Sequence, residues 1–292
     1  MEYSSLLLFL VGLAVGSFLN VLSLRYDPDK PIFRREVFGG RSHCMACRKQ
    51  LRWFELVPIV SFLLQRGRCR SCGARLSLQY PIVELLAGLL AFSIPLRLSQ
   101  IYFFELRATS AFPFWFVLLS VVFVLAGFVL LFLSAVDARL KLIPDQANVS
   151  IATLGIAATL IPLWFALPQK SFLGHFALLF GFQDGFVINR ISAALFGLAF
   201  FGVIVALTRG RGMGFGDVKL AAALGFLLGW PDIALASFLA FILGAFSGIL
   251  LIVRRVKTMK SAVPFGPFIV MGALLVFFFG EVFMQWYFNL FP

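Results

Sequence analysis

The chain alternates between long apolar stretches and short segments that carry nearly all of its charge. A helix that crosses the hydrocarbon core of a bilayer, about 30 Å thick, needs about 20 mostly apolar residues. Such stretches predict seven transmembrane helices, at Ser4–Leu24, Pro81–Leu96, Ala111–Val136, Ala147–Leu167, Ile191–Thr208, Ile233–Val253 and Ser261–Gly280. An eighth stretch, Leu220–Trp230, is too short to span comfortably unless neighbours such as Val218 join it.

The distribution of basic residues favours eight spans over seven. Twelve Lys and Arg residues lie from Arg25 to Arg75, and further clusters follow the third, fifth and seventh spans. With eight spans, 21 of the 25 basic residues fall on one face; with seven, the clusters at 209–219 and 254–260 fall on opposite faces. Because cytoplasmic loops are enriched in Lys and Arg, we expect eight helices, a cytoplasmic basic face and both termini outside. Pro231 and Asp232 would then form a tight outer turn.

The composition also indicates a membrane protein. Hydrophobic residues make up 61% of the chain and charged residues only 13%, against about 25% charged residues in an ordinary soluble domain. A soluble globule, a disordered chain and a disulfide-rich secreted module are therefore excluded. Glu2 stands where a cleaved signal peptide carries basic residues, and the apolar run is too long for one. We expect the first helix to stay in the membrane.

The predicted fold is an all-α polytopic membrane protein of about eight transmembrane helices with one small cytosolic domain. The only sizeable polar segment, Arg25–Tyr80, follows the first helix. We expect three parts: a first helix at 1–24, a cytosolic domain at 25–80 and a transmembrane domain at 81–292. The net charge of +12 lies next to an anionic bilayer surface. Membrane lipids and topology account for it, so we expect no nucleic-acid partner.

The cytosolic domain contains all four cysteines, in the pattern C-x2-C-x21-C-x2-C. Two C-x2-C turns can place four thiolates tetrahedrally around one Zn²⁺ ion. Two disulfides are an alternative, but this loop should face a reducing cytosol. A redox C-x2-C pair would not explain two copies. The sequence predicts a structural zinc site with the ligands Cys44, Cys47, Cys69 and Cys72.

Three acids lie at the ends of apolar stretches, and the eight-span topology puts them at one membrane level. Asp137 ends the third span, Asp145 enters the fourth, and Asp217 enters the sixth. Ionisable residues at such positions are costly, so they point to function. Ordinary roles stay open as well. Asp145 or Asp217 could cap a helix, and Asp137 could pair with Arg139 or Lys141.

Two carboxylates at one membrane edge favour aspartic proteolysis. One carboxylate acts as the base on a water molecule, while the other is protonated and polarises the scissile carbonyl. Gly214 and Gly216, just before Asp217, would let a substrate backbone approach closely. The sequence has no G-x-S-x-G, H-E-x-x-H or Walker motif. A cation- or proton-coupled transporter with an intramembrane acidic site is the main alternative, and a non-catalytic zinc-bearing assembly factor is a second.

A set of motifs along nearly the whole chain carries a family resemblance. They are Gly16-Ser17-Phe18-Leu19-Asn20-Val21, the two C-x2-C turns, Tyr80-Pro81-Ile82-Val83-Glu84, Asp137 with Ile143-Pro144-Asp145, Gly212-Met213-Gly214-Phe215-Gly216-Asp217-Val218-Lys219, and Pro264-Phe265-Gly266-Pro267. In this combination the chain resembles the type IV prepilin peptidases, bacterial leader peptidases of the G-x-G-D aspartic class.

The resemblance implies an inner-membrane peptidase whose catalytic pair is Asp137 and Asp217, with Asp145 and Lys219 in supporting positions. It implies substrates with a short basic leader and a following hydrophobic helix, namely type IV prepilins and the pseudopilins of type II secretion. It also implies a second activity, N-methylation of the new amino terminus with S-adenosylmethionine. Glu55 and Glu84 are candidate participants in methyl transfer, and a salt bridge to a nearby Arg is an equal alternative for each.

Overall fold

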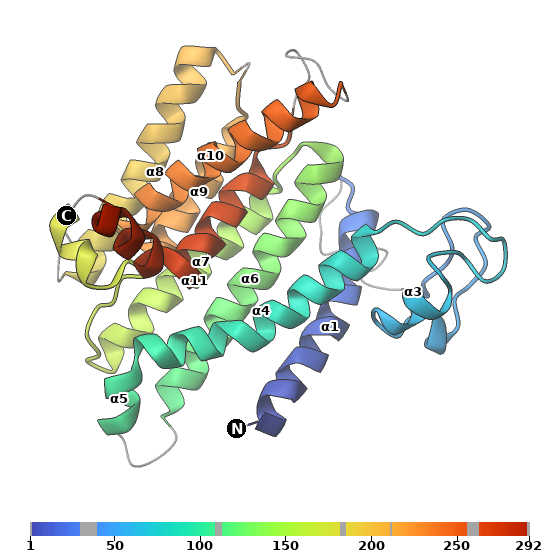
Figure 1. The fold of residues 1–292 in the computed structure, drawn as a ribbon, viewed down its shortest axis with the longest axis horizontal. Coiled ribbons are helices and arrows are strands. Elements are labelled where there is room, and N and C mark those ends of the chain that lie inside the picture. Colours follow the sequence, from blue (N-terminus) through green and yellow to red (C-terminus); the bar gives the residue numbers. More distant parts are fainter. Residues whose placement is uncertain are drawn as a thin grey trace.

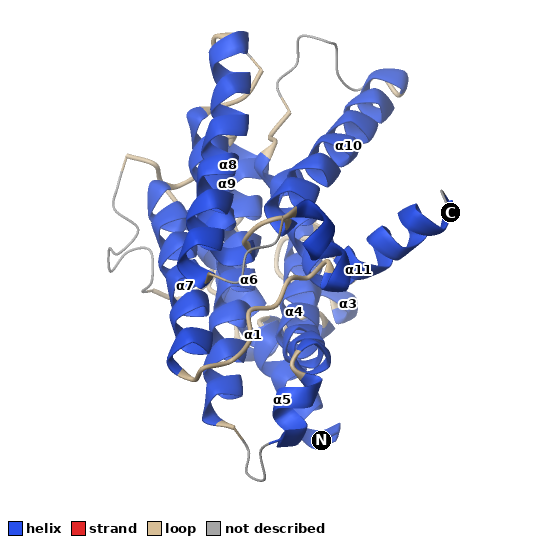
Figure 2. Ribbon diagram, turned by 90° about the vertical axis from the view of Figure 1, so that its left-hand side faces the viewer, coloured by secondary structure: helices blue, strands red, loops and turns tan. Residues whose placement is uncertain are grey.

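The computed structural model describes residues 2–29, 40–108, 113–181, 185–210, 212–255 and 263–290. Within these ranges the chain is helical and has no extended strand, which confirms the predicted all-α membrane fold (Figures 1 and 2). The longer helices are α1 (Glu2–Arg25), α4 (Gln79–Ile101), α6 (Phe114–Leu140), α7 (Asp145–Trp164), α8 (Phe186–Thr208), α9 (Phe215–Leu228), α10 (Asp232–Val253) and α11 (Gly266–Leu290). The shorter ones are η1 (Trp53–Glu55), α3 (Val60–Leu64), α5 (Phe103–Ala108) and η2 (Gly174–Phe180).

Seven of the described helices are long and apolar enough to cross a membrane, namely all the longer ones except α9. They correspond to the seven predicted spans, with ends that differ by several residues. The last span differs most, because α11 continues past Gly280 to Leu290. Glu281 interrupts the apolar run there without ending the helix, since apolar residues resume directly after it.

The short helix α9 nevertheless connects the two ends of the bundle. It has 14 residues, a length of about 21 Å at 1.5 Å per residue. Asp217 lies in its first turn, beside the end of α6. In its last turn, the Leu227 carbonyl oxygen accepts a 2.6 Å hydrogen bond from Arg190, which lies near the start of α8. The helix α10 then begins at Asp232, as the predicted tight turn requires. Because α7, α8, α10 and α11 contact α9, it need not match the bilayer thickness by itself.

Small residues let the helices around α9 approach closely. A Cβ atom on Gly155 of α7 would lie 2.7 Å from the Leu227 nitrogen of α9. One on Gly197 of α8 would lie 2.6 Å from the Ala221 carbonyl oxygen of α9. Backbone contact of this kind stabilises helix pairs in lipid, where burial of apolar surface gives little driving force. Gly12 brings α1 against α4 in the same way.

The polar segment between α1 and α4 lies beside the helical bundle, where Figure 1 shows α3 projecting away from α1 and α4. Residues 40–78 contain η1, α3 and two tight turns. An isolated antiparallel bridge closes each turn, His43 with Gln50 and Arg68 with Arg75. Six basic residues used in the topology prediction lie outside the described residues: Lys30, Arg34, Arg35, Arg211, Lys257 and Lys260.

Candidate active site

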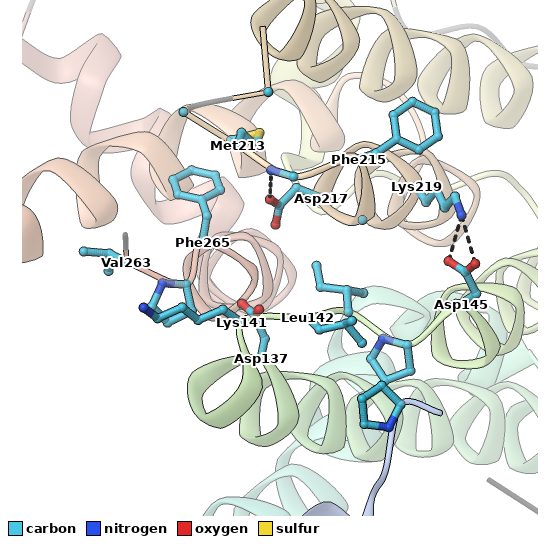
Figure 3. Close-up of a pocket in the computed structure, with 18 of the residues that line it drawn as sticks. Asp137, Lys141, Leu142, Asp145, Met213, Phe215, Asp217, Lys219, Val263 and Phe265 are labelled. Atoms are coloured by element: carbon cyan, nitrogen blue, oxygen red, sulfur yellow. Dashed lines mark hydrogen bonds and ion pairs between the residues drawn. The ribbon is translucent and has the colours of Figure 1, made fainter. Parts of the chain in front are cut away.

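Three interhelical loops and the residues after α1 surround a cavity of 610 Å³ at one end of the bundle. The loops join α6 to α7, α8 to α9 and α10 to α11. Asp137, Asp145 and Asp217 all line this cavity, which we call the aspartate cavity (Figure 3). The three acids that the sequence places at one membrane level therefore meet at one site.

Asp137 lies in the last turn of α6 and is 4% exposed. Its Oδ2 atom accepts a 3.0 Å hydrogen bond from the backbone N–H of Gly266, the first residue of α11. Arg139, one of the basic residues that could have paired with it, instead donates to the Leu24 and Tyr26 carbonyl oxygens, at 2.6 and 2.9 Å. The guanidinium of Arg139 thus fixes the end of α1 against α6, beside the cavity.

Asp217 lies in the first turn of α9 and is 7% exposed. Its Oδ2 atom accepts a 3.2 Å hydrogen bond from the Gly214 N–H, and its own N–H donates to the Gly214 carbonyl oxygen at 3.2 Å. This reciprocal pair caps the helix, so the capping role that the sequence left open is present. The cap uses one carboxylate oxygen, and Figure 3 shows the carboxylate directed into the cavity toward the side that carries Asp137.

Asp145 is not the N-cap of α7, so that interpretation of the sequence is wrong. Pro144 occupies the cap position, and Asp145 is the first helical residue. Its carboxylate instead pairs with Lys219 of α9, whose Nζ atom lies 2.8 Å from Oδ1 and 3.0 Å from Oδ2 (Figure 3). The side chains are 66% and 42% exposed, so the pair contributes at most about 1 kcal/mol to stability. It links the starts of α7 and α9 at the rim of the cavity.

The two glycines before Asp217 have different surroundings. A Cβ atom on Gly214 would have its nearest neighbour, Asp217 Oδ2, at 3.8 Å, so the backbone there is open to the cavity. A Cβ atom on Gly216 would lie 3.1 Å from Ile143 Cβ. The expectation of close substrate approach therefore suits Gly214, whereas Gly216 lets α9 pack against the α6–α7 loop.

The four cysteine sulfur atoms form one cluster, in which all lie within 4.8 Å of one another. The two C-x2-C turns are built alike. The Cys44 N–H donates to the carbonyl five residues later at 2.9 Å, and the Cys69 N–H does the same at 2.8 Å. The residue after each second cysteine has a positive φ, 57° at Arg48 and 71° at Gly73. The predicted cluster is thus confirmed as a possible metal site.

The chemistry and spacing of this cluster fit a structural zinc ion. A tetrahedral shell with Zn–S bonds of about 2.3 Å separates its sulfur atoms by about 3.8 Å, and the Cys44 and Cys72 sulfur atoms lie 3.9 Å apart. Hydrogen bonds from the backbone N–H groups of Cys47 and Ala46 lower the pKa of the Cys44 thiol to about 7, which favours the thiolate that a metal requires. The Ala74 N–H lowers the pKa of the Cys72 thiol, but burial and hydrogen bonds with the other three sulfur atoms raise it to about 11. Four sulfur ligands complete the shell, so His43 is not needed.

The two glutamates near the cysteine cluster accept backbone hydrogen bonds, and neither has a salt bridge in the described parts of the chain. Glu84 of α4 is 6% exposed and accepts from the Ile59 N–H at 2.7 Å and from the Ser17 side chain. Ile59 has a φ of 60°, which is rare for a β-branched residue. Glu84 therefore anchors a strained loop of the cysteine segment to the bundle. Glu55 accepts from the Arg52 N–H at 2.8 Å.

Sequence reasoning missed the role of a buried acid at the opposite end of the bundle. The Asp232 carboxylate accepts hydrogen bonds from Ser171 Oγ and from the N–H groups of Phe172 and Leu173, at 3.0, 2.9 and 3.1 Å. It fixes the connection between α7 and α8 to the start of α10. Its partners lie about 60 residues away in sequence, so no local pattern could have indicated them.

Comparison with known proteins supplies the family. A model of the Type IV leader peptidase family matches residues 123–249, and a model of the Bacterial Peptidase A24 N-terminal domain matches residues 10–98. The prepilin leader peptidase/N-methyltransferase of Aeromonas hydrophila is 32% identical over 96% of this chain and 92% of its own length. The chain belongs to the type IV leader peptidase family. The protein of the same name from Bacillus subtilis (strain 168) is 31% identical over 96% of each chain.

Family membership confirms that the chain is an enzyme and that the resemblance in its motifs is real. The leader peptidase match contains all three acids of the aspartate cavity, and the N-terminal match contains the four cysteines with Glu55 and Glu84. An enzyme family of this kind favours catalysis over transport or a purely structural role. No solved structure shows significant similarity to this chain.

Proposed function

We propose that this chain cleaves the basic leader from type IV prepilins and type II secretion pseudopilins at the cytoplasmic face of the bacterial inner membrane. It then N-methylates the new amino terminus with S-adenosylmethionine. The observation that carries the proposal is that Asp137 and Asp217 line one cavity at one end of the bundle. The names of the relatives support the reaction and the class of substrate.

The surroundings of the two aspartates suit a shared water molecule. One oxygen of Asp137 accepts from the Gly266 N–H, and one oxygen of Asp217 accepts from the Gly214 N–H. Backbone donors hold both carboxylates in place, and the second oxygen of each is left for water or substrate. One carboxylate takes a proton from the water, which adds to the scissile carbonyl, while the protonated partner donates to the carbonyl oxygen. The peptide C–N bond then breaks, and the leaving nitrogen takes up a proton to become the new amine.

The cavity lies where such a substrate would present its scissile bond. A prepilin keeps its basic leader in the cytosol, next to the anionic leaflet, and its hydrophobic helix in the bilayer. The bond between the two parts would then lie at the membrane edge, at the level of the aspartate cavity. Asp145 and Lys219 would support the site by fixing the starts of α7 and α9 at its rim. Gly214 leaves room there for the substrate backbone.

The remaining parts of the chain have distinct roles in this proposal. Residues 1–24 form the first transmembrane helix, 25–80 a cytosolic domain and 81–292 the transmembrane peptidase domain, all embedded among membrane lipids. Cys44, Cys47, Cys69 and Cys72 would hold one zinc ion, which joins the two turns of a domain that has few long apolar stretches. S-adenosylmethionine would supply the methyl group, with Glu55 and Glu84 as candidate participants.

Cleavage of a prepilin by the purified protein tests this function. A synthetic prepilin is incubated with and without S-adenosylmethionine, and the products are analysed by mass spectrometry. We expect a new amino terminus directly after the basic leader, and the added mass of one methyl group only when S-adenosylmethionine is present. A prepilin that stays intact contradicts the proposal, and cleavage without methyl gain limits the function to proteolysis.

A further inference from the structure

The short helix α3 in the cysteine segment has an apolar face on its outside. Val60, Leu63 and Leu64 are three and four residues apart, so they share one face of the helix, and their exposed fractions are 51%, 67% and 79%. The other side, with Ser61 and Gln65, lines a second cavity, of 460 Å³, that also has residues of α1 and α4 in its wall. A helix on a soluble domain has the reverse arrangement. The apolar set, which we call the outer face of α3, therefore indicates a neighbour other than water.

The depth of α3 at the membrane follows from its attachment to α4. The N–H group of Ile59, directly before α3, donates a 2.7 Å hydrogen bond to Glu84. Glu84 lies in the second turn of α4, about 8 Å along the helix from its start at 1.5 Å per residue. Leu85 and Leu86, next to it, are 43% and 42% exposed on a helix that is long and apolar enough to cross a membrane. The outer face therefore lies at the level of apolar surface residues of α4, and α3 projects sideways from the bundle there (Figure 1).

The charge of the cysteine segment complements anionic lipid headgroups. Residues 40–78 contain eight basic residues, all exposed, and one acid, Glu55, which gives a net charge of +7. Two of the basic residues, Arg66 and Arg68, follow α3 directly. Trp53 in η1, which contacts α3, is 79% exposed, and Trp is enriched at membrane interfaces. An apolar helix face with flanking Arg and an exposed Trp is typical of segments that lie in the plane of a membrane surface.

We propose that the outer face of α3 inserts into the lipid leaflet beside α4, and that the neighbouring arginines contact anionic headgroups. The proposed cytoplasmic orientation makes this leaflet the anionic one. Lipid contact then holds the cysteine segment against α4 together with the hydrogen bond from Ile59 to Glu84. The insertion does not depend on whether the aspartates cleave a prepilin, because none of the residues that carry it lines the aspartate cavity.

Photocrosslinking in a lipid bilayer tests which molecule covers the outer face. The full-length protein with p-benzoylphenylalanine in place of Leu64 is reconstituted in nanodiscs of phosphatidylcholine and phosphatidylglycerol and irradiated, and its peptides are analysed by mass spectrometry. The same group in place of Leu86 reports an apolar surface position of α4, and in place of Ser71, in the second cysteine turn, a position off the outer face. We expect lipid adducts at positions 64 and 86 and few at 71. Adducts at position 64 to protein alone, from this chain or from a second copy, or no lipid adduct there, overturn the proposal.

Hydrogen exchange measures how firmly the leaflet holds α3. The backbone N–H groups of Ser61, Leu63 and Gln65 donate within this part of the chain, and their exchange slows when the helix is inserted in lipid. In nanodiscs, Leu64→Gln should speed exchange in α3 by about tenfold, which is about 1.4 kcal/mol, because it removes a buried apolar side chain from the leaflet. Met45→Gln, at an apolar residue that is 70% exposed in the first cysteine turn, should leave exchange unchanged. Zinc content verifies the folding of both variants. Unchanged exchange in Leu64→Gln contradicts insertion.

Replacement of one arginine tests the contribution of the anionic headgroups. Arg66, directly after α3, and Arg48, at the end of the first cysteine turn, have similar positive φ angles of 53° and 57°, so the two positions are matched in backbone conformation. In discs with phosphatidylglycerol, Arg66→Gln should speed exchange in α3 by about fivefold, which is about 1 kcal/mol, and Arg48→Gln should have a smaller effect. In discs of phosphatidylcholine alone, neither substitution should change exchange. Equal effects of Arg66→Gln in the two lipids, or no effect in either, contradict the contact with anionic lipid.

Discussion

At the scale of single residues, both aspartates depend on backbone N–H groups at helix starts. Gly266 begins α11 and donates to Asp137, and Gly214 precedes α9 and donates to Asp217. A Cβ atom on Gly266 would lie 2.7 Å from Asp137 Oδ2, so a side chain there would displace the carboxylate. The position of the Asp137 carboxylate is therefore set by the shape of the α11 start.

Gly266→Ala should reduce prepilin cleavage by at least about tenfold, because small displacements of a reacting group have large effects on rate. The new methyl group would push the Asp137 carboxylate away from its place. Initial cleavage rates of the purified variant measure the effect. Gly248→Ala on α10, where a Cβ atom meets nothing within 4 Å, serves as the control and should cleave normally. Normal cleavage by Gly266→Ala would show that the contact does not position Asp137.

The sequence predicted that Asp137 and Asp217 lie close together, but it could not predict which backbone groups donate hydrogen bonds to them. The chain has only 13 acids, so Asp137 and Asp217 at the ends of apolar stretches were distinctive. The Gly266 N–H is 129 residues from Asp137 in sequence, and only the fold brings them together. The motif Pro264-Phe265-Gly266-Pro267 was a signal that position 266 matters, without showing why. In the same way, Asp145 pairs with Lys219, 74 residues away in sequence, and does not cap α7 as the sequence suggested.

At the scale of helices, the number of predicted membrane spans, seven or eight, depends on α9. Its length does not decide whether it crosses the membrane, and the prediction of eight spans rests on the distribution of basic residues. Close contacts at glycines pack it against its neighbours, at Gly155 of α7 and Gly197 of α8. These contacts involve backbone atoms, so hydropathy alone does not predict them. They hold the first turn of α9, and with it Asp217, opposite the end of α6.

Gly197→Leu should destabilise the bundle by about 1–3 kcal/mol, as an overpacked side chain usually does. Its Cβ atom would collide with the Ala221 carbonyl oxygen at 2.6 Å. Gly202→Leu provides a control in the same helix, since nothing lies within 4 Å of a Cβ atom there. Thermal unfolding in detergent, followed by circular dichroism, should show a lower midpoint for Gly197→Leu only. Equal midpoints for the two variants would contradict close α8–α9 packing.

At the scale of the whole molecule, residues at the end of α1 line both the aspartate cavity and a second cavity beneath the cysteine segment. Composition and charge predicted a helical membrane protein with one small polar domain, and the spacing of the four cysteines predicted the zinc site of that domain. The sequence could not show that Glu84 of α4 accepts a hydrogen bond from Ile59 of this domain. Nor could it show that a cavity lies between the domain and the helices α1 and α4. Both depend on how the domain is oriented against the bundle, which has no local signature in sequence.

Cys44→Ser should lower the zinc content from about one ion per chain, because three thiolates bind zinc less tightly than four. We expect proteolysis to cut the 40–78 segment faster in this variant, while the helical content of the bundle stays close to normal. Metal analysis and limited proteolysis measure the two effects. Ser71→Ala, inside the second cysteine turn, retains all four ligands and should keep its zinc. Undiminished zinc in Cys44→Ser would contradict the four-sulfur site.

Cleavage of a prepilin by aspartate variants tests the central claim most directly. Asp137→Asn and Asp217→Asn keep the shape of each side chain and the acceptor for its backbone N–H, but remove the acid–base chemistry. Each should lower the cleavage rate by at least about a hundredfold, with unfolding midpoints near that of the unsubstituted protein. Asp29→Asn, at an exposed position after α1, should cleave normally. A folded Asp137→Asn or Asp217→Asn protein that cleaves at the full rate would contradict the two-aspartate account.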